Sequence, residues 1–220
     1  MRARFLVAFV ILIAAGLLFH FLQAPTAERR EREMLQRIED FTAGQGSVKP
    51  VVFLGDSLVE HASFSPSICG RPVINAGYSG AVASGVLRLV EAFDRIRFSP
   101  AVLVISVGVN DSIVVDRRPF AETYPEIIQR AAALGGKVFA VSLAPIARPG
   151  SLADEVDRSR FAEIDRVIRE TARERAIPLI DVGTLRTRTS PLVADGVHLS
   201  QDGYAAWTGT IETALNGQCP

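Results

Sequence analysis

Ser57 carries a hydroxyl group that could act as a nucleophile. It lies in Gly55-Asp56-Ser57-Leu58, directly after an apolar run over residues 51–54 that predicts a buried strand. A serine at a strand-to-helix turn can project its hydroxyl from the edge of a sheet, next to the backbone N–H groups that begin the helix. Such a serine can equally be an ordinary helix N-cap, and the short motif alone does not choose between the two roles.

A serine hydroxyl needs a base to act as a nucleophile, and the chain has three histidines. His20 lies inside an apolar run, and His61 follows Ser57 by four residues, where a helix-surface position is expected. His198 remains, and Asp195 precedes it by three residues, so the two side chains can share one face of a turn. Such a carboxylate can hold the imidazole tautomer and stabilise the imidazolium. Taken alone, the Asp-Gly pair at 195–196 also suits an ordinary turn.

Acyl transfer also needs hydrogen-bond donors for an oxyanion. Gly77 offers a backbone N–H that no side chain covers, and Asn110 offers a side-chain amide. Each of these residues is individually typical of a turn as well. Their joint occurrence with the serine and the histidine, in polar segments next to predicted elements, favours a catalytic site over four unrelated turns.

The elements that must bring these residues together are short apolar runs rich in Val and Ile, alternating with amphipathic stretches. Buried strands are predicted at residues 51–54, 73–75, 101–107, 137–143 and 177–182. Apolar residues recur at helical spacing over residues 86–96, 161–172 and 200–215. Strands that alternate with helices predict a mostly parallel sheet covered on both faces. The carboxyl ends of such strands meet at one edge, so the polar segments should gather there.

In this order, the four polar segments resemble the sequence blocks of the SGNH/GDSL hydrolase family, and the likeness extends from about residue 50 to the end of the chain. The blocks are Gly55-Asp56-Ser57-Leu58, Asn75-Ala76-Gly77, Gly108-Val109-Asn110-Asp111 and Asp195-Gly196-Val197-His198. The resemblance implies that Ser57 is the nucleophile, His198 the base and Asp195 the acid that orients the base. It also implies an oxyanion hole formed by the backbone N–H groups of Ser57 and Gly77 and by the Asn110 side chain.

The fold that the resemblance implies is a flavodoxin-like three-layer α/β/α sandwich, with a five-stranded parallel sheet in the order 2-1-3-4-5. The expected activity is hydrolysis of carboxylic esters, with short O-acyl groups such as those on envelope glycans, through an acyl-enzyme. An O-acyltransferase to glycans and a non-catalytic protein that binds acylated glycans are the alternatives, and lysophospholipid and thioester substrates stay open. The chain lacks Gly-x-Ser-x-Gly, Walker, dinucleotide and His-Glu-x-x-His patterns, so no metal or cofactor is expected.

Residues 1–27 contain an apolar run of 18 residues, from Phe5 to Leu22. As a helix it would extend ~27 Å, enough to cross the hydrocarbon core of a bilayer. The run is longer than a usual signal peptide core, and the candidate cleavage site near Ala24 is poor, which favours an uncleaved membrane anchor over a secretory signal. We therefore expect the catalytic domain outside the cytoplasmic membrane, in the periplasm or at the cell surface, or secreted if the segment is cleaved.

Residues 28–49 mix both charge signs and predict a short solvated helix or stalk that ends in a linker, so that residues 50–220 form the hydrolase domain. The whole chain has 24 basic and 24 acidic side chains, and this zero net charge argues against a nucleic-acid-binding protein. The apolar share of 48% excludes a disordered chain.

The chain has two cysteines, Cys69 and Cys219. Cys69 precedes the second predicted strand, and Cys219 follows the last predicted helix, so both should lie at the edge of the sheet opposite the polar segments. A location outside the cytoplasm would permit a disulfide between them. Two free thiols are the other interpretation.

Overall fold

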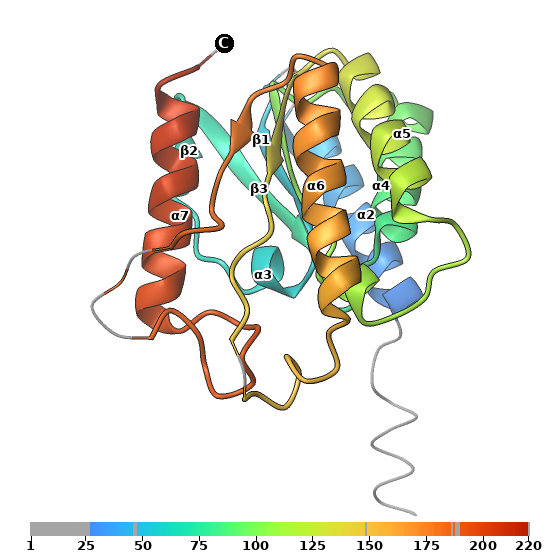
Figure 1. The fold of residues 1–220 in the computed structure, drawn as a ribbon. Helices are drawn as coiled ribbons and strands as arrows, with labels where there is room; N and C mark the ends of the chain where they lie inside the picture. The colour runs from blue at the N-terminus through green and yellow to red at the C-terminus, as the bar shows by residue number, and fades with distance from the viewer. Residues whose placement is uncertain (1–26, 46–47, 148, 186, 188–189, 220) are drawn as a thin grey trace, which may run out of the picture.

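A six-stranded sheet forms the middle layer of the protein in the computed structural model, which describes residues 27–45, 48–147, 149–185, 187 and 190–219 (Figure 1). The strand order is β2-β3-β1-β4-β5-β6. The strands are β1 (Val51–Gly55), β2 (Ser67–Ile68), β3 (Arg71–Gly77), β4 (Val102–Ser106), β5 (Lys137–Val141) and β6 (Leu179–Ile180). All residues of β1 and β4 are buried because helices cover both faces of these central strands, which explains their continuous apolar sequences.

Five of the six strands run parallel, in the order that the family resemblance implies. β1 pairs in parallel with β3 and β4, β4 with β5, and β5 with β6. The sixth strand, β2, was not expected: it pairs antiparallel with β3 at the sheet edge. It has only two residues, too few for a recognisable alternation, and the tight turn that joins it to β3 has positive φ angles at Cys69 and Gly70.

The helices divide unequally between the two faces of the sheet (Figure 1). One face carries α2 (Ala27–Gln45), α4 (Ala83–Arg95), α5 (Phe120–Ala133) and α6 (Arg158–Glu174), and the other carries α3 (Ser57–Glu60) and α7 (Gln201–Asn216). A short 3₁₀ helix, η1 (Asn110–Ser112), follows β4. Helix α5 was not among the predicted elements. It has Pro125 in its interior, yet it buries Tyr124, Ile127 and Ile128 in the core.

Helix α2 packs on the domain where the sequence suggested a solvated stalk. Met34 and Ile38 are 4% and 0% exposed and belong to the same apolar core as α4 and β3. The guanidinium of Arg88 in α4 donates to the carboxylate of Glu31 at 2.8 Å, which fixes the first half of α2. Apolar residues at helical spacing make a stripe that must be covered, and here α4 and the sheet cover it.

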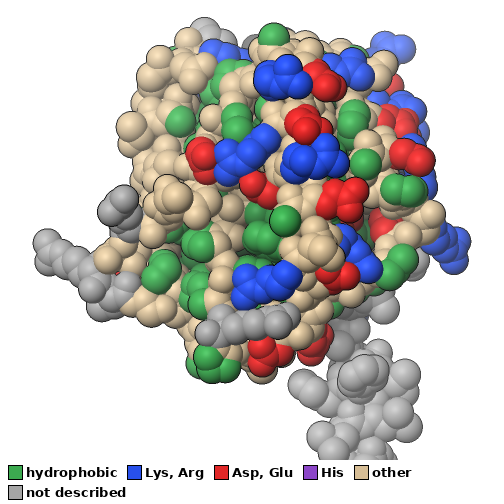
Figure 2. Space-filling view, viewed as in Figure 1, with side chains coloured by type: hydrophobic (Ala, Val, Ile, Leu, Met, Phe, Trp, Pro, Cys, Tyr) green, Lys and Arg blue, Asp and Glu red, His purple; other side chains and the backbone are tan. Residues whose placement is uncertain are grey.

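The predicted membrane segment, Phe5 to Leu22, lies outside the described residues. In the part of the chain that the structure describes, no helix combines the length and the apolar character that a membrane span requires. Figure 2 shows basic and acidic side chains interleaved on the face over α6, where Arg166 pairs with Glu170 at 2.6 Å. Neither charge sign dominates that face.

A disulfide joins Cys69 and Cys219, whose Cα atoms are 5.5 Å apart. It ties the turn before β3 to the end of α7 at the amino-terminal edge of the parallel strands, opposite the polar segments. Of the two interpretations of these cysteines, the bridge is the one confirmed.

Candidate active site

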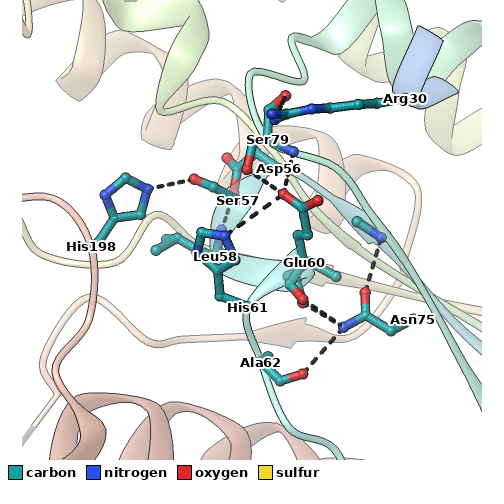
Figure 3. Close-up of polar contacts among 12 residues, drawn as sticks. Arg30, Asp56, Ser57, Leu58, Glu60, His61, Ala62, Asn75, Ser79 and His198 are labelled. Atoms are coloured by element: carbon teal, nitrogen blue, oxygen red, sulfur yellow. Dashed lines mark hydrogen bonds and ion pairs between the residues drawn. The ribbon is translucent and has the colours of Figure 1, made fainter. Parts of the chain in front are cut away.

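Ser57 opens helix α3 directly behind strand β1. The N-cap is Asp56, whose Oδ1 accepts a hydrogen bond from the Leu58 N–H at 3.0 Å. Because Asp56 satisfies the helix terminus, the hydroxyl of Ser57 is free for another partner. Its Oγ lies 2.8 Å from Nε2 of His198, which approaches from the segment before α7 (Figure 3). The N-cap interpretation of Ser57 is therefore wrong, and the pairing with His198 is the one observed.

Asp195 holds the other side of the His198 ring. Its Oδ2 lies 2.6 Å from Nδ1 of His198, while its Oδ1 accepts hydrogen bonds from the N–H groups of Val197 and His198, both at 2.9 Å. Burial raises the pKa of Asp195, but these hydrogen bonds outweigh it, and the pKa lies below its ordinary value. The carboxylate is therefore charged at neutral pH, and it fixes the ring so that Nε2 faces the serine.

Gly77 occupies a different role from the one the sequence suggested. Its N–H donates to Oδ1 of Asn75 at 3.0 Å, and the Asn75 amide in turn donates to the carbonyl of Val59 at 2.6 Å. A Cβ at position 77 would lie 2.4 Å from the backbone nitrogen of Glu60. Gly77 is thus required for the close approach of β3 to α3. Its N–H is already engaged, so this geometry does not support it as an oxyanion donor.

Asn110 lies at the start of η1, at the carboxyl end of β4, and its amide donates to the Ala81 carbonyl at 2.9 Å. This bond uses one of its two amide hydrogens and leaves the other available. Ala81 lies in the loop between β3 and α4, and this loop also contains Gly80. Gly80 has φ 79° and no atom within 4 Å of the position that a Cβ would take. Among the described residues, none accepts a hydrogen bond from the Gly80 N–H.

Two buried carboxylates support the loops around the serine. Asp111 accepts the Ala83 N–H with both oxygens, at 3.0 and 3.2 Å, and so caps α4. Burial raises the pKa of Asp56 to about 7 and that of Asp111 to about 6. In the sequence, both residues stood out only as members of their motifs. Each carboxylate accepts a hydrogen bond from a backbone N–H group, and no spacing in the sequence predicted this structural role.

A polar rim, formed by Arg30, Glu60, His61 and Ser79, borders the serine (Figure 3). The Glu60 carboxylate accepts the Ser79 N–H at 2.7 Å as well as the Ser79 hydroxyl, and it lies 3.8 Å from Nε2 of His61. Arg30 of α2 donates to the Ser79 carbonyl at 3.3 Å. His61 is exposed, as the sequence suggested, and its ring centre is 5.8 Å from that of His198. Arg30 and Glu60 were not predictable from the sequence, because their partner Ser79 is distant in the chain.

The described residues contain no group of three or more His, Cys, Asp or Glu side chains that could hold a metal ion. The chemistry that this geometry offers is that of a serine activated by a histidine. The model of the GDSL-like lipase/acylhydrolase family matches residues 40–206. The chain belongs to this family. Membership makes the protein a GDSL-like acylhydrolase, an enzyme that hydrolyses esters.

Solved structures resemble this GDSL-like acylhydrolase in fold over most of its length. A putative platelet activating factor from Streptococcus pneumoniae has a TM-score of 0.68 and 18% identity, covering 93% of this chain and 99% of its own. The lipase/acylhydrolase from Enterococcus faecalis has a TM-score of 0.63 and 24% identity, covering 79% and 98%. An acetylxylan esterase from Geobacillus stearothermophilus has a TM-score of 0.57 and 16% identity, covering 76% and 93%. No curated protein sequence matches the chain.

Proposed function

We propose that this acylhydrolase cleaves short-chain O-acyl esters through a Ser57–His198–Asp195 triad and an acyl-enzyme intermediate. The observation that carries the proposal is a chain of two hydrogen bonds. One joins Ser57 Oγ and His198 Nε2 at 2.8 Å, and the other joins His198 Nδ1 and Asp195 Oδ2 at 2.6 Å. A hydroxyl, an imidazole and a carboxylate in hydrogen-bond reach of one another are the parts that nucleophilic acyl transfer requires.

In the first half of the reaction, Ser57 Oγ attacks the carbonyl carbon and His198 Nε2 takes its proton. The tetrahedral intermediate then breaks the bond to the alcohol oxygen, which receives that proton from His198. In the second half, water attacks the acyl carbonyl carbon and His198 Nε2 takes its proton. The tetrahedral intermediate then breaks its bond to Ser57 Oγ, which receives that proton from His198, and the carboxylic acid is released. Asp195 stays charged and stabilises the imidazolium formed in each half.

The oxyanion needs donors that no other group uses. The Ser57 N–H is in the first turn of α3 and has no partner within that helix. The second Asn110 amide hydrogen and the Gly80 N–H are the further donors that we propose, with Gly80 replacing Gly77. The Asn110–Ala81 bond holds the loop of Gly80 against η1, so these two donors belong to one rigid unit.

A short acyl group suits the space next to the nucleophile. The space lined by Asp56 and Leu58, the neighbours of Ser57 in the chain, measures only about 10 Å³, room for about one water molecule and too little for a long acyl chain. An ester with a small acyl group can instead approach from the open side, where the exposed His61 borders the site.

The decisive experiment measures turnover of 4-nitrophenyl acetate, butyrate and octanoate by the wild type and by Ser57→Ala. We expect acetate and butyrate to react faster than octanoate, and Ser57→Ala to reduce kcat by about 10³-fold or more. Ser67→Ala, an exposed serine on β2 at the opposite edge, is the matched control and should keep normal activity. A fluorophosphonate probe should label the wild type and the control but not Ser57→Ala. Labelling of Ser57→Ala would exclude Ser57 as the nucleophile.

We also propose that residues 1–27 anchor the enzyme in a membrane with its domain outside the cytoplasm. The Cys69–Cys219 disulfide supports this location, because disulfides persist in oxidising compartments. The full chain should stay in the membrane pellet after a carbonate wash, and protease added to right-side-out vesicles should degrade the domain. Release by carbonate would contradict the anchor.

A further inference from the structure

Residues 78–81 form a tight turn between β3 and α4. The Ala81 N–H donates to the Tyr78 carbonyl at 3.2 Å, which makes Ser79 and Gly80 the two central residues of a β-turn. Gly80 has φ 79°, the value that the second central residue takes in a type II turn. A type I turn closes with the same hydrogen bond and differs mainly in the central peptide group, which is turned over by about half a rotation. The orientation of the peptide group that joins Ser79 to Gly80 is therefore a separate structural choice.

Neighbouring elements fix the two ends of this turn. The Tyr78 N–H donates to the carbonyl of Gly55, the last residue of β1, at 3.1 Å. At the other end, the Asn110 amide donates to the Ala81 carbonyl at 2.9 Å. Neither hydrogen bond involves the central peptide group, so the turn can change its type while both of them remain intact.

Two side chains of opposite charge hold the centre of the turn. The Glu60 carboxylate accepts hydrogen bonds from the N–H of Ser79, at 2.7 Å, and from its hydroxyl. Nη1 of Arg30 donates to the carbonyl of Ser79 at 3.3 Å. Figure 3 shows Arg30 reaching Ser79 from α2, on the side away from Glu60. Hydrogen bonds to charged groups are about twice as strong as neutral ones, so this pair can select one form of the turn.

The contact with Arg30 fixes the direction of the Gly80 N–H. In a trans peptide group, the C=O and the N–H point in opposite directions. Because Arg30 holds the Ser79 carbonyl, the Gly80 N–H points away from Arg30, and none of the described residues accepts a hydrogen bond from it. Turning the peptide group over would exchange the two groups. A carbonyl oxygen would then take the place of the donor and would repel an oxyanion.

We propose that Arg30 is a positioning residue, which holds this turn in its type II form and so presents the Gly80 N–H to the oxyanion. This inference rests on the proposed function, because it names the residue that keeps one of the proposed oxyanion donors in place. The guanidinium also polarises the peptide group, which makes the Gly80 N–H a stronger donor. Helix α2, which precedes all the catalytic motifs in the chain, thereby contributes to the active site.

Helix α2 should stay in place when the Arg30 side chain is shortened. Met34 and Ile38 are buried in the core, and Glu31 pairs with Arg88 of α4 at 2.8 Å. None of these contacts involves Arg30. The variant Arg30→Met keeps most of the apolar stem and removes the charged donor, so a loss of activity with an unchanged unfolding midpoint can be assigned to the turn.

The first test measures turnover of 4-nitrophenyl acetate by the full chain in detergent. In Arg30→Met, kcat should fall about ten- to hundredfold while KM stays within about twofold, because this neutral ester offers Arg30 no charge to bind. Arg32→Met, an exposed arginine on the same helix, is the matched control and should keep the wild-type kcat. Arg30→Lys keeps a charged donor and should recover most of the loss. A loss confined to KM, or a lysine variant as slow as the methionine variant, would overturn the proposal.

The second test asks whether Arg30 acts through Gly80. Gly80→Ala places a Cβ on a residue with φ 79°, which disfavours the type II turn. Adding Arg30→Met to Gly80→Ala should therefore lower kcat by no more than about twofold further. A trifluoromethyl ketone forms an adduct with serine that carries the oxyanion, so its inhibition should weaken in Arg30→Met by the same factor as kcat/KM. Fully independent effects of the two substitutions, or unchanged inhibition, would contradict this route.

Failure of the proposed function gives a different pattern. If Ser57 were not the nucleophile, Ser57→Ala would retain turnover of 4-nitrophenyl acetate. If the triad acts but Gly80 donates nothing to the oxyanion, Ser57→Ala would be inactive while Gly80→Ala and Arg30→Met would both keep the wild-type kcat. That second pattern would overturn the role of Arg30 and leave the triad intact.

Discussion

Replacing Asp195 by asparagine tests the role of this carboxylate without changing the size of the side chain. Oδ1 of Asp195 accepts two backbone N–H groups, from Val197 and His198, at 2.9 Å each. In Asp195→Asn the amide oxygen must keep this position, because turning the NH₂ group there would set donor against donor. The NH₂ group then faces Nδ1 of His198, in place of the oxygen now 2.6 Å away.

The consequence is a change of tautomer. An NH₂ donor at Nδ1 makes that nitrogen an acceptor, so the ring proton moves to Nε2, which faces Ser57 Oγ at 2.8 Å. Nε2 can then no longer take the serine proton. We expect kcat to fall about 10⁴-fold, which corresponds to about 5 kcal/mol of transition-state stabilisation. Folding should change little, because the two backbone hydrogen bonds survive.

The assay combines turnover of 4-nitrophenyl acetate, urea unfolding and the ¹⁵N spectrum of the His198 ring. The matched control is Asp181→Asn, since Asp181 is 54% exposed and pairs with Arg169 of α6 at 2.7 Å, away from the triad. It should keep activity within about twofold of the wild type. A folded Asp195→Asn enzyme that retains kcat within about tenfold, or a ring that still carries its proton on Nδ1, would refute this account of the tautomer.

Three further predictions concern the oxyanion, the disulfide and a buried acid. Asn110→Ala should lower kcat for nitrophenyl acetate by about 10²–10³-fold, and a loss confined to KM would contradict its role as an oxyanion donor. The double variant Cys69→Ala, Cys219→Ala removes a disulfide with a sequence separation of 150, so the free energy of unfolding in urea should fall by up to about 5 kcal/mol while kcat stays unchanged. Equal unfolding midpoints for the variant and the wild type would contradict this. Burial raises the pKa of Asp56 from 3.8 to about 7, so the folded state keeps its proton where the unfolded chain has lost it. The free energy of unfolding should therefore fall by about 3 kcal/mol from pH 4 to pH 7. Asp56→Asn should remove most of that fall, as measured by urea unfolding at each pH. The same pH dependence in the variant and the wild type would contradict this role of Asp56.

The alternation of apolar runs with amphipathic stretches was enough to predict the parallel sheet. β1 and β4 are buried on both faces, which leaves continuous Val, Ile and Leu in their sequences. The two-residue β2 and the proline-containing α5 were not predictable in this way. β2 depends on a turn at Cys69 and Gly70, and α5 is stabilised by burying Tyr124 and Ile127 against distant residues.

The candidate site likewise has residues that the sequence predicted and one that it did not. His198 was reachable by elimination among three histidines, and Asp195 by its spacing from His198. The choice between Gly77 and Gly80 as a donor was not reachable, because it depends on Asn75, whose side chain takes the Gly77 N–H. A backbone N–H is chemically identical in every glycine, and only its surroundings decide whether it is free.

The sequence by itself determined the five parallel strands of the sheet, the serine, histidine and aspartate as candidate site residues, and an apolar segment ahead of the domain. These features are local: they follow from residue type and from spacing along the chain. The tertiary structure decided that α2 is packed rather than solvated, that Cys69 is bonded to Cys219, and that Arg30 of α2 contacts Ser79. Such contacts join residues far apart in the chain, and their energies depend on distances and burial that exist only once the chain has folded.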